Sequence, residues 1–311
     1  MHGIHAKFLL LFPEGFVKMA NSKYQVFLSV MESRNLTKSA EQLGYTQPSI
    51  SHILSSMEKE IGAPLFIRTK RGVFPTGTAL FLEKHVRQIV AAEDALTQDI
   101  FLMQGIEVGK IRIGSYLSIS TQWLPHIVST FLAKHPQVEL EFFIGTNEEL
   151  AQWLLDGKLD FALNSDPIPE KFEFMCLYKD PILAVLPQDN PLTEYLAIDL
   201  HDLAQYPFII PCEESDKKIS TIMDNEGIPF HIRFLTRGGS PTLAMINQGL
   251  GVTLTHKLPL LSDLASFRNI VARPIRQEFS RNLGICCRSF ASVSRLERAF
   301  IQDVTDYAQL L

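Results

Sequence analysis

Short polar side chains gather on one face of a helix that the sequence predicts from Thr46 onward. The apolar residues of this segment recur at the spacing of a helix that packs one face on a core. They are Ile50, Ile53, Leu54, Met57 and Ile61. The opposite face carries Gln47, Ser49, Ser51, His52 and Ser55. Side chains of this size and polarity hydrogen-bond base edges and phosphates in a major groove, so the pattern predicts a helix that contacts double-stranded DNA.

Two flanking segments complete the module. A short helix starts near Thr37 and ends at Gly44, and a tight turn joins it to the next helix, which predicts a helix-turn-helix. Residues 63–76 then predict a small hairpin, or wing, whose basic turn would contact flanking phosphates. Each feature alone is common on protein surfaces, but their order favours DNA binding. The expected DNA contacts are Thr37, Thr46, Gln47, Pro48, Ser49, Ser51, His52, Ser55, Arg68, Lys70 and Arg71.

The charge of the chain is unevenly distributed. The 311 residues carry a net charge of −5, yet residues 19–82 hold seven Lys and Arg against four Glu. Residues 83–311 hold 20 basic against 29 acidic residues. A basic surface attracts the phosphate backbone, whereas an acidic body limits nonspecific adhesion to nucleic acid. The basic N-terminal module is therefore the part that we expect to bind DNA.

These segments closely resemble the LysR-type transcriptional regulators. The matching residues are "NLTKSAEQL" (35–43), "TQPSISHILSSMEKEIGAPLF" (46–66), Arg68, Arg71 and "PTGTAL" (75–80). Ser39, Thr46 and Met57 depart mildly from the family's usual Ala, Ser and Leu. The resemblance implies a winged helix-turn-helix domain at residues 19–78, a linker helix at 79–106 that pairs two subunits, and an effector-binding domain at 107–311. Residues 1–18 are interpreted as an N-terminal extension.

A long segment without proline runs from Thr78 to Gln104. Apolar residues alternate along it at spacings of four and three, as in helices that pair through a seam. The alternative is a helix that packs on its own domain. We expect a homodimer or homotetramer whose interface contains Leu82, Val86, Ile89, Leu96 and Ile100. Two recognition helices related by a two-fold axis would then contact two half-sites of DNA.

The remaining chain alternates predicted strands and helices, which indicates parallel α/β units. The chain is expected to cross between two subdomains near Pro167 and again near Pro274. Subdomain I would hold residues 107–166 and 275–311, and subdomain II residues 167–274. In the family, this domain resembles periplasmic solute-binding proteins, which hold a small molecule between two subdomains. The predicted fold class is therefore α/β, with an all-α-type winged helix-turn-helix domain at the N-terminus.

Candidate effector contacts follow the predicted strands or open the predicted helices, where ligands of such folds bind. The family places hydroxyl groups at the positions of Ser118 and Thr146. The expected effector contacts are Ser118, Thr146, Asn164, Pro211, Cys212, Ser240 and Thr255. The hydroxyls of Ser118, Thr146 and Ser240 would serve equally well as helix caps. Hydroxyls and helix N-termini favour a small anion, such as a carboxylate, as the effector.

Several function classes lack support in the sequence. The motifs G-x-S-x-G, H-E-x-x-H, the Walker loop and C-x-x-C are absent, so we expect no enzyme activity, no metal and no cofactor. No apolar run reaches the roughly 18–20 residues that span a bilayer, and a cytoplasmic location is expected. RNA polymerase would be a further partner if the protein activates transcription. The alternatives are a regulator switched by the Cys212 thiol and a solute-binding protein, which would need an export signal.

Overall fold

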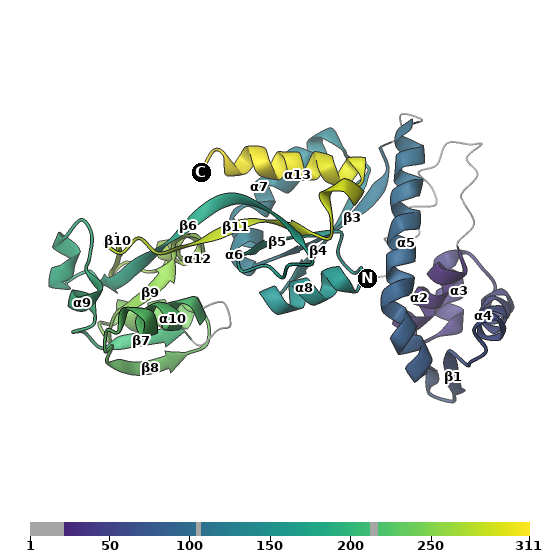
Figure 1. The fold of residues 1–311 in the computed structure, drawn as a ribbon, viewed down its shortest axis with the longest axis horizontal. Coiled ribbons are helices and arrows are strands. Elements are labelled where there is room, and N and C mark those ends of the chain that lie inside the picture. Colours follow the sequence, from purple (N-terminus) through teal and green to yellow (C-terminus); the bar gives the residue numbers. More distant parts are fainter. Residues whose placement is uncertain (1–21, 104–106, 212–216) are drawn as a thin grey trace. The chain divides into compact units, whose positions relative to one another are not determined.

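The computed structural model describes residues 22–103, 107–211 and 217–311 (Figure 1). The expected extension at residues 1–18 and the candidate Cys212 lie outside the described residues. The chain divides into two compact units. The N-terminal unit holds residues 1–106 and 155–158, and the C-terminal unit holds residues 107–154 and 159–311.

Three helices form the body of the N-terminal unit. They are α2 (Lys23–Ser33), α3 (Leu36–Leu43) and α4 (Gln47–Ile61). Ser22, Asn35 and Thr46 are their N-cap residues, and each side chain accepts a hydrogen bond from an amide of the first turn. Gly44 ends α3 with a φ of 71°, which produces the predicted tight turn before α4. The core under these helices includes Phe27, Ile50, Leu54 and Leu65.

A hairpin and a long helix complete the N-terminal unit. They are β1 (Phe66–Thr69), β2 (Gly72–Pro75) and α5 (Gly77–Met103). The two strands pair antiparallel, with Thr69 opposite Gly72. Gly72 has a φ of 133°, and a Cβ there would lie 3.0 Å from the Arg34 carbonyl oxygen. Because Val73 N–H donates to that same oxygen, the hairpin passes too close to α2 for a larger residue at position 72.

Subdomain I of the C-terminal unit is built on three parallel strands. They are β3 (Gly109–Ser115), β4 (Val138–Ile144) and β5 (Phe161–Ser165), with β3 between the other two. Its helices are α6 (Leu117–Gln122), α7 (Leu124–Lys134), α8 (Asn147–Leu155) and α13 (Arg295–Ala308). Figure 1 shows α7 and α13 on one face of these strands and α8 on the other. The rings of Phe131 and Phe161 both lie against Phe300 in the core between the sheet, α7 and α13.

Two long strands join subdomain I to the rest of the unit. They are β6 (Glu173–Pro187) and β11 (Ser280–Cys287). The strands pair antiparallel with each other, and β11 also pairs antiparallel with β5. Seven of the described strands thus form a mixed sheet in the order β10-β6-β11-β5-β3-β4, in which β10 is Ile270–Pro274, and β9 (Thr253–His256) also pairs with β6. The predicted parallel pairing is present between β3 and β4 and between β3 and β5, whereas β6 and β11, which run between the subdomains, pair antiparallel.

Subdomain II occupies the far ends of these strands. Its elements are η1 (Pro191–Glu194), α9 (Leu200–Leu203), β7 (Phe208–Pro211), α10 (Lys217–Glu226), β8 (Ile232–Thr236), α11 (Gly239–Asn247), β9 (Thr253–His256), α12 (Lys257–Asp263), η3 (Leu264–Ser266) and β10 (Ile270–Pro274). A last short turn, η4 (Phe290–Ser292), precedes α13.

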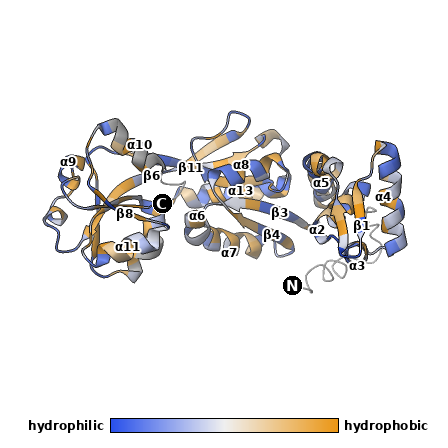
Figure 2. Cartoon of the chain, turned by 90° about the horizontal axis from the view of Figure 1, so that it is seen from below, coloured by the Kyte–Doolittle hydropathy of each residue, from blue (hydrophilic) through white to orange (hydrophobic). Residues whose placement is uncertain are grey.

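Helices such as α5 and α11 carry both hydrophobic and hydrophilic residues, as expected when one side faces a core (Figure 2). Within the described residues, no helix combines the length and apolarity needed to cross a membrane.

Candidate DNA-binding and effector sites

Helix α4 presents the polar face that the sequence predicts. Ile50, Leu54 and Met57 are buried, whereas His52 is exposed. Ser51 is half-buried, as are the remaining polar residues of this face: Gln47, Ser49 and Ser55. Within the first turn, Thr46 and Pro48 are exposed. The capped helix therefore offers amide, hydroxyl and imidazole groups to a groove.

The wing lies beside this face. The Arg68 Nη2 atom donates to Ser51 Oγ at 2.8 Å, which joins β1 directly to α4. The turn is ordered by Thr69, whose hydroxyl donates to Gly72 O and accepts from Arg71 N–H, both at 3.1 Å. Lys70 and Arg71 are exposed at the turn, and Thr37 is exposed on α3. Cations held next to a polar helix suit contacts with phosphates flanking the bases.

Helix α5 differs from the expected pairing seam in two residues. Val86 is 4% exposed and belongs to the core of the N-terminal unit, and Leu82 packs against that core. These two residues therefore follow the alternative interpretation, a helix packed on its own domain. The exposed apolar residues of α5 are Leu80, Phe81, Ile89, Leu96, Ile100 and Met103. Apart from Leu80, they form one stripe, which we call the α5 stripe.

The hydroxyl candidates of subdomain I have different roles. Thr146 caps α8: its hydroxyl accepts from Glu149 N–H at 3.3 Å, and its own N–H donates to Glu149 Oε2 at 2.9 Å. This reciprocal pair is a capping box. Ser118 lies inside α6, whose N-cap is Tyr116, so the capping interpretation fails for Ser118. The Ser118 side chain is half-buried, as is Thr146.

Asn164 lies deeper than the hydroxyl candidates. It is the penultimate residue of β5, it is 2% exposed, and it pairs with Gly284 of β11. The neighbouring strand β11 ends in two buried cysteines. Burial raises the pKa of the Cys286 thiol to about 11 and that of the Cys287 thiol to about 12. Thiols with such pKa values are protonated at neutral pH and poorly reactive. Neither is therefore suited to the thiol switch considered from the sequence, whose candidate Cys212 lies outside the described residues.

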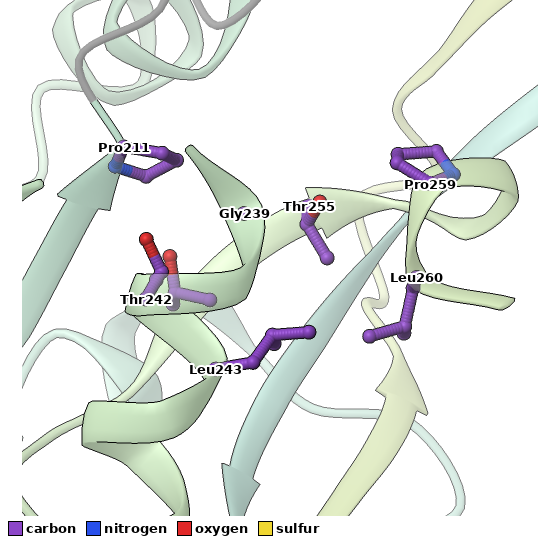
Figure 3. Close-up of a pocket in the computed structure, with 8 residues that line it drawn as sticks. Pro211, Gly239, Thr242, Leu243, Thr255, Pro259 and Leu260 are labelled. Atoms are coloured by element: carbon purple, nitrogen blue, oxygen red, sulfur yellow. The ribbon is translucent and has the colours of Figure 1, made fainter. Parts of the chain in front are cut away.

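A small pocket gathers candidates of subdomain II. It has a volume of about 30 Å³ and is lined by Pro211, Gly239, Thr242, Leu243, Thr253, Thr255, Pro259 and Leu260. Figure 3 shows these side chains converging from the ends of β7 and β9 and from α11 and α12. Pro211 and Thr255 were predicted, whereas Ser240 is exposed next to the lining residue Gly239. Gly238 is the N-cap of α11, so Ser240 does not cap that helix.

The pocket has hydroxyls among apolar walls. Thr253 Oγ1 donates to Ile209 O at 2.7 Å, and Thr242 Oγ1 donates to Gly238 O at 3.1 Å. All the lining residues are uncharged. A volume of about 30 Å³ holds one or two water molecules, so a metabolite would need further space beyond this wall.

Two family models cover these regions. Residues 22–80 match the bacterial regulatory helix-turn-helix protein of the lysR family, and residues 104–309 match the LysR substrate binding domain. The chain belongs to the LysR family. It is thus a DNA-binding transcriptional regulator with an effector-binding domain, and the predicted fold class and family are confirmed.

LysR-family relatives extend over most of the chain. The uncharacterized HTH-type transcriptional regulator YvbU of Bacillus subtilis is 28% identical over 91% of this chain and 97% of its own length. The HTH-type transcriptional regulator CbbR of Rhizobium meliloti is 31% identical over 83% of this chain and 82% of its own. A full-length OxyR variant from Pseudomonas aeruginosa has a similar fold, with a TM-score of 0.71 and 21% identity over 95% of this chain and 96% of that one.

Sequence reasoning missed several residues of this LysR-family effector unit. Thr242 and Pro259 line the pocket but follow no motif, because helices α11 and α12 bring them together from different parts of the chain. Tyr116 was also missed, although its hydroxyl lies 3.1 Å from Ser165 Oγ at the ends of β3 and β5. Tyr116 lies two residues after the strand predicted at residues 109–114, and that position was the signal that could have identified it.

Proposed function

We propose that this LysR-family regulator binds an operator as a homo-oligomer and that a small effector in its C-terminal unit changes that binding. The observation that supports DNA reading best is the capped helix α4, with a polar face beside the cations of the wing. The expected base contacts are Gln47 and His52, and the expected phosphate contacts are Arg68 and Arg71. Two such helices in one oligomer would contact two half-sites.

The α5 stripe supports pairing of two subunits. Leu96 is 55% exposed and Met103 87% exposed in the single chain. Exposed apolar residues repeated along one side of a helix lower their free energy by packing against a second helix. We propose that the dimer seam runs through Phe81, Ile89, Leu96, Ile100 and Met103, with Leu82 and Val86 retained by their own core.

Two sheet edges support a second contact between copies, as a homotetramer requires. Among the described strands, β4 and β8 each end a sheet, and each exposes apolar residues: Phe142 and Ile144 on β4, and Ile232 and Leu235 on β8. The β4 strand carries Glu139 and Glu141, whereas Arg233 lies on β8 and Arg237 directly follows it. An edge with exposed backbone groups readily pairs with another chain. Contact of β4 with the β8 of a two-fold-related copy would repeat twice and close.

The effector acts in this proposal through differential affinity. A ligand shifts an equilibrium between two arrangements only if it binds one more tightly than the other. The ligand groups are proposed to come from Ser118, Thr146 and Asn164 of subdomain I and from the pocket around Pro211 and Thr255. A small anion remains the proposed effector. RNA polymerase is a proposed partner only if the protein activates transcription.

The experiment that tests this function has two parts. Selection from random duplex DNA should enrich a sequence with two half-sites. Selection with the Gln47→Ala variant should enrich that sequence less strongly and with a relaxed preference. A metabolite panel measured by thermal shift should then reveal a ligand that raises the melting temperature and alters affinity for that site. Enrichment of no sequence would contradict the DNA-binding assignment, and turnover of a stabilising compound would favour an enzyme.

A further inference from the structure

A buried ion pair lies where the two long strands of the C-terminal unit meet. Asp180 of β6 and Arg281 of β11 are cross-strand neighbours. Arg281 Nε donates to Asp180 Oδ2 at 3.0 Å, and Arg281 Nη2 lies 2.9 Å from the same oxygen. The Asp180 side chain is fully buried and that of Arg281 is 6% exposed. Since β6 and β11 both run between the subdomains, the pair lies on the connection itself.

One side of this pair reaches α12, a helix that enters from subdomain II and places Leu258 in the core of subdomain I. Asp180 Oδ1 accepts a hydrogen bond of 2.9 Å from Leu258 N–H, in the first turn of α12. Free amides of a first turn need an acceptor, and here a strand 78 residues away supplies it. Pro259 and Leu260, which follow directly, line the pocket. The carboxylate of Asp180 therefore fixes the start of the helix that forms one wall of the pocket.

The other side of the pair reaches subdomain I. The Arg281 guanidinium carbon lies 5.6 Å from the centre of the Tyr116 ring, within the range of a cation–π contact. The Tyr116 hydroxyl lies 3.1 Å from Ser165 Oγ, and Asn147 Nδ2 donates to Ser165 O. Tyr116, Asn147 and Ser165 stand at the ends of β3 and β5 and at the start of α8. These are the ends where subdomain I offers its candidate effector groups.

A fully buried ion pair is a costly way to obtain stability alone. Removing both charges from water costs several kcal/mol, and apolar residues of similar volume often stabilise a protein equally well. Apolar residues do not reproduce the directional hydrogen bonds of this pair. The N–H groups of the Arg281 guanidinium and the two oxygens of the Asp180 carboxylate each require a partner at a set angle. The contribution that distinguishes this pair is thus the placement of its neighbours.

We propose that Asp180 and Arg281 are positioning residues that link the two walls of the effector site. One wall is the segment from Tyr116 into α6 and the other is the start of α12, and through this pair the two segments become ordered or disordered together. Effector binding on one wall would then change the order of the other. The inference rests on the proposed effector site, but its test requires no effector. Failure to find any ligand would therefore count against the proposed function and leave this link standing.

The test is hydrogen–deuterium exchange of the full-length protein, read in peptides covering residues 116–122 and 257–263. Arg281→Met leaves a buried carboxylate without its cation and should lower stability. The double variant Asp180→Asn, Arg281→Met removes both charges and keeps an oxygen for Leu258 N–H, so stability should recover. Exchange in both peptides should nevertheless rise about five-fold or more, the low end of usual coupling between sites. The reason is that the amide at position 180 loses the guanidinium that holds it in place below Leu258 N–H, and the Tyr116 ring loses its cation.

Arg273→Met is the matched control. Arg273 also lies on a strand, β10, but it is half-buried, and its Nε donates to the Thr193 carbonyl oxygen. Both peptides should exchange in this variant as in the parent protein. A double variant with parental exchange in both peptides, or with a change in one peptide alone, would overturn the proposal. The first outcome would assign the link to the direct packing of α6 on α12.

Discussion

The two units of this protein differ in how the chain assembles their candidate sites. In the N-terminal unit, the candidate DNA contacts lie between Thr37 and Arg71, on adjacent elements, and most belong to one helix. In the C-terminal unit, the candidate effector contacts range from Ser118 to Thr255 and come from separate strands and helices. A site carried by one helix is visible in a sequence pattern. A site carried by strand ends exists only after the sheet has formed, and its residues have additional structural duties.

The largest expected effect concerns pairing of the N-terminal units through the α5 stripe. Ile89→Lys would place one charge per subunit in an apolar interface, where an unpaired charge is costly. We expect loss of the dimer in light scattering, together with loss of two-half-site DNA binding. Ala91→Lys adds the same charge on another side of α5 and should leave the dimer intact. A dimeric Ile89→Lys protein would show that the stripe is not the seam.

The stability of the C-terminal unit should depend on pH. Burial, and then the charge of Asp160, raise the pKa of Glu297 at the start of α13 to about 7. A carboxyl group with a raised folded-state pKa favours folding at low pH, and this contribution is lost as pH rises through about 7. The C-terminal unit should therefore lose up to about 3 kcal/mol between pH 4.5 and 8, at about 1.4 kcal/mol per pKa unit.

Chemical denaturation across this pH range measures the effect. Glu297→Gln should flatten the pH dependence, whereas the exposed Glu226→Gln should not. An unchanged slope in Glu297→Gln would assign the pH dependence to other groups.

DNA recognition should divide between α4 and the wing. Gln47→Ala should cost roughly 1–3 kcal/mol at the selected site and relax its sequence preference. Arg71→Ala should instead weaken binding to all DNA about equally and reduce the salt dependence. Fluorescence anisotropy at several salt concentrations distinguishes the two patterns. If Gln47→Ala retains both affinity and preference, the polar face of α4 does not read bases.

The Thr146 hydroxyl caps a helix and the Ser118 hydroxyl does not, so variants of these two residues can be compared. Thr146→Val removes the cap of α8 and should lower the free energy of unfolding by about 0.5–2 kcal/mol, whereas Thr146→Ser should restore it. Ser118→Ala should leave stability nearly unchanged. If both hydroxyls contact the effector, Thr146→Ser should bind it better than Thr146→Val, and Ser118→Ala should lose affinity without loss of stability. Equal stability of Thr146→Val and the parent would show that the cap contributes little.

The smallest expected effect concerns the sheet edges β4 and β8. In the Ile89→Lys background, any remaining association would come from the C-terminal units. Glu139→Lys should weaken it, and adding Arg237→Glu should restore it, each ion pair contributing about 0.2–1 kcal/mol. Sedimentation velocity at low salt provides the measurement. If Glu139→Lys and the double variant both associate as the Ile89→Lys protein does, pairing of these edges is ruled out.

The sequence predicted the N-terminal unit well because its signals are local. The caps at Asn35 and Thr46, the glycine at position 44 and the apolar spacing of α4 all act within a few residues. The register of α5 was predicted less well. Leu82 and Val86 share a helical periodicity with Ile89, but packing against α2 decides which apolar residues remain free, and that packing is tertiary.

The C-terminal unit was predicted as a pattern but not in detail. Its alternating elements were correct, yet the antiparallel course of β6 and β11 depends on two strands about 100 residues apart in the sequence. The same holds for the Asp180–Arg281 pair, since neither residue belongs to a local motif. For Thr146 the local sequence was compatible with two roles, a helix cap and an effector contact, and the structure confirms the cap.

The contrast between the cysteines of β6 and β11 has a practical consequence. Cys286 and Cys287 are buried and protonated, whereas Cys176 is exposed on the neighbouring strand. Among the described cysteines, a maleimide dye should therefore react first with Cys176. With Cys212 replaced by serine, a fluorophore at Cys176 would report on the connection between the subdomains, and changes in its emission would follow ligand-driven motion in real time.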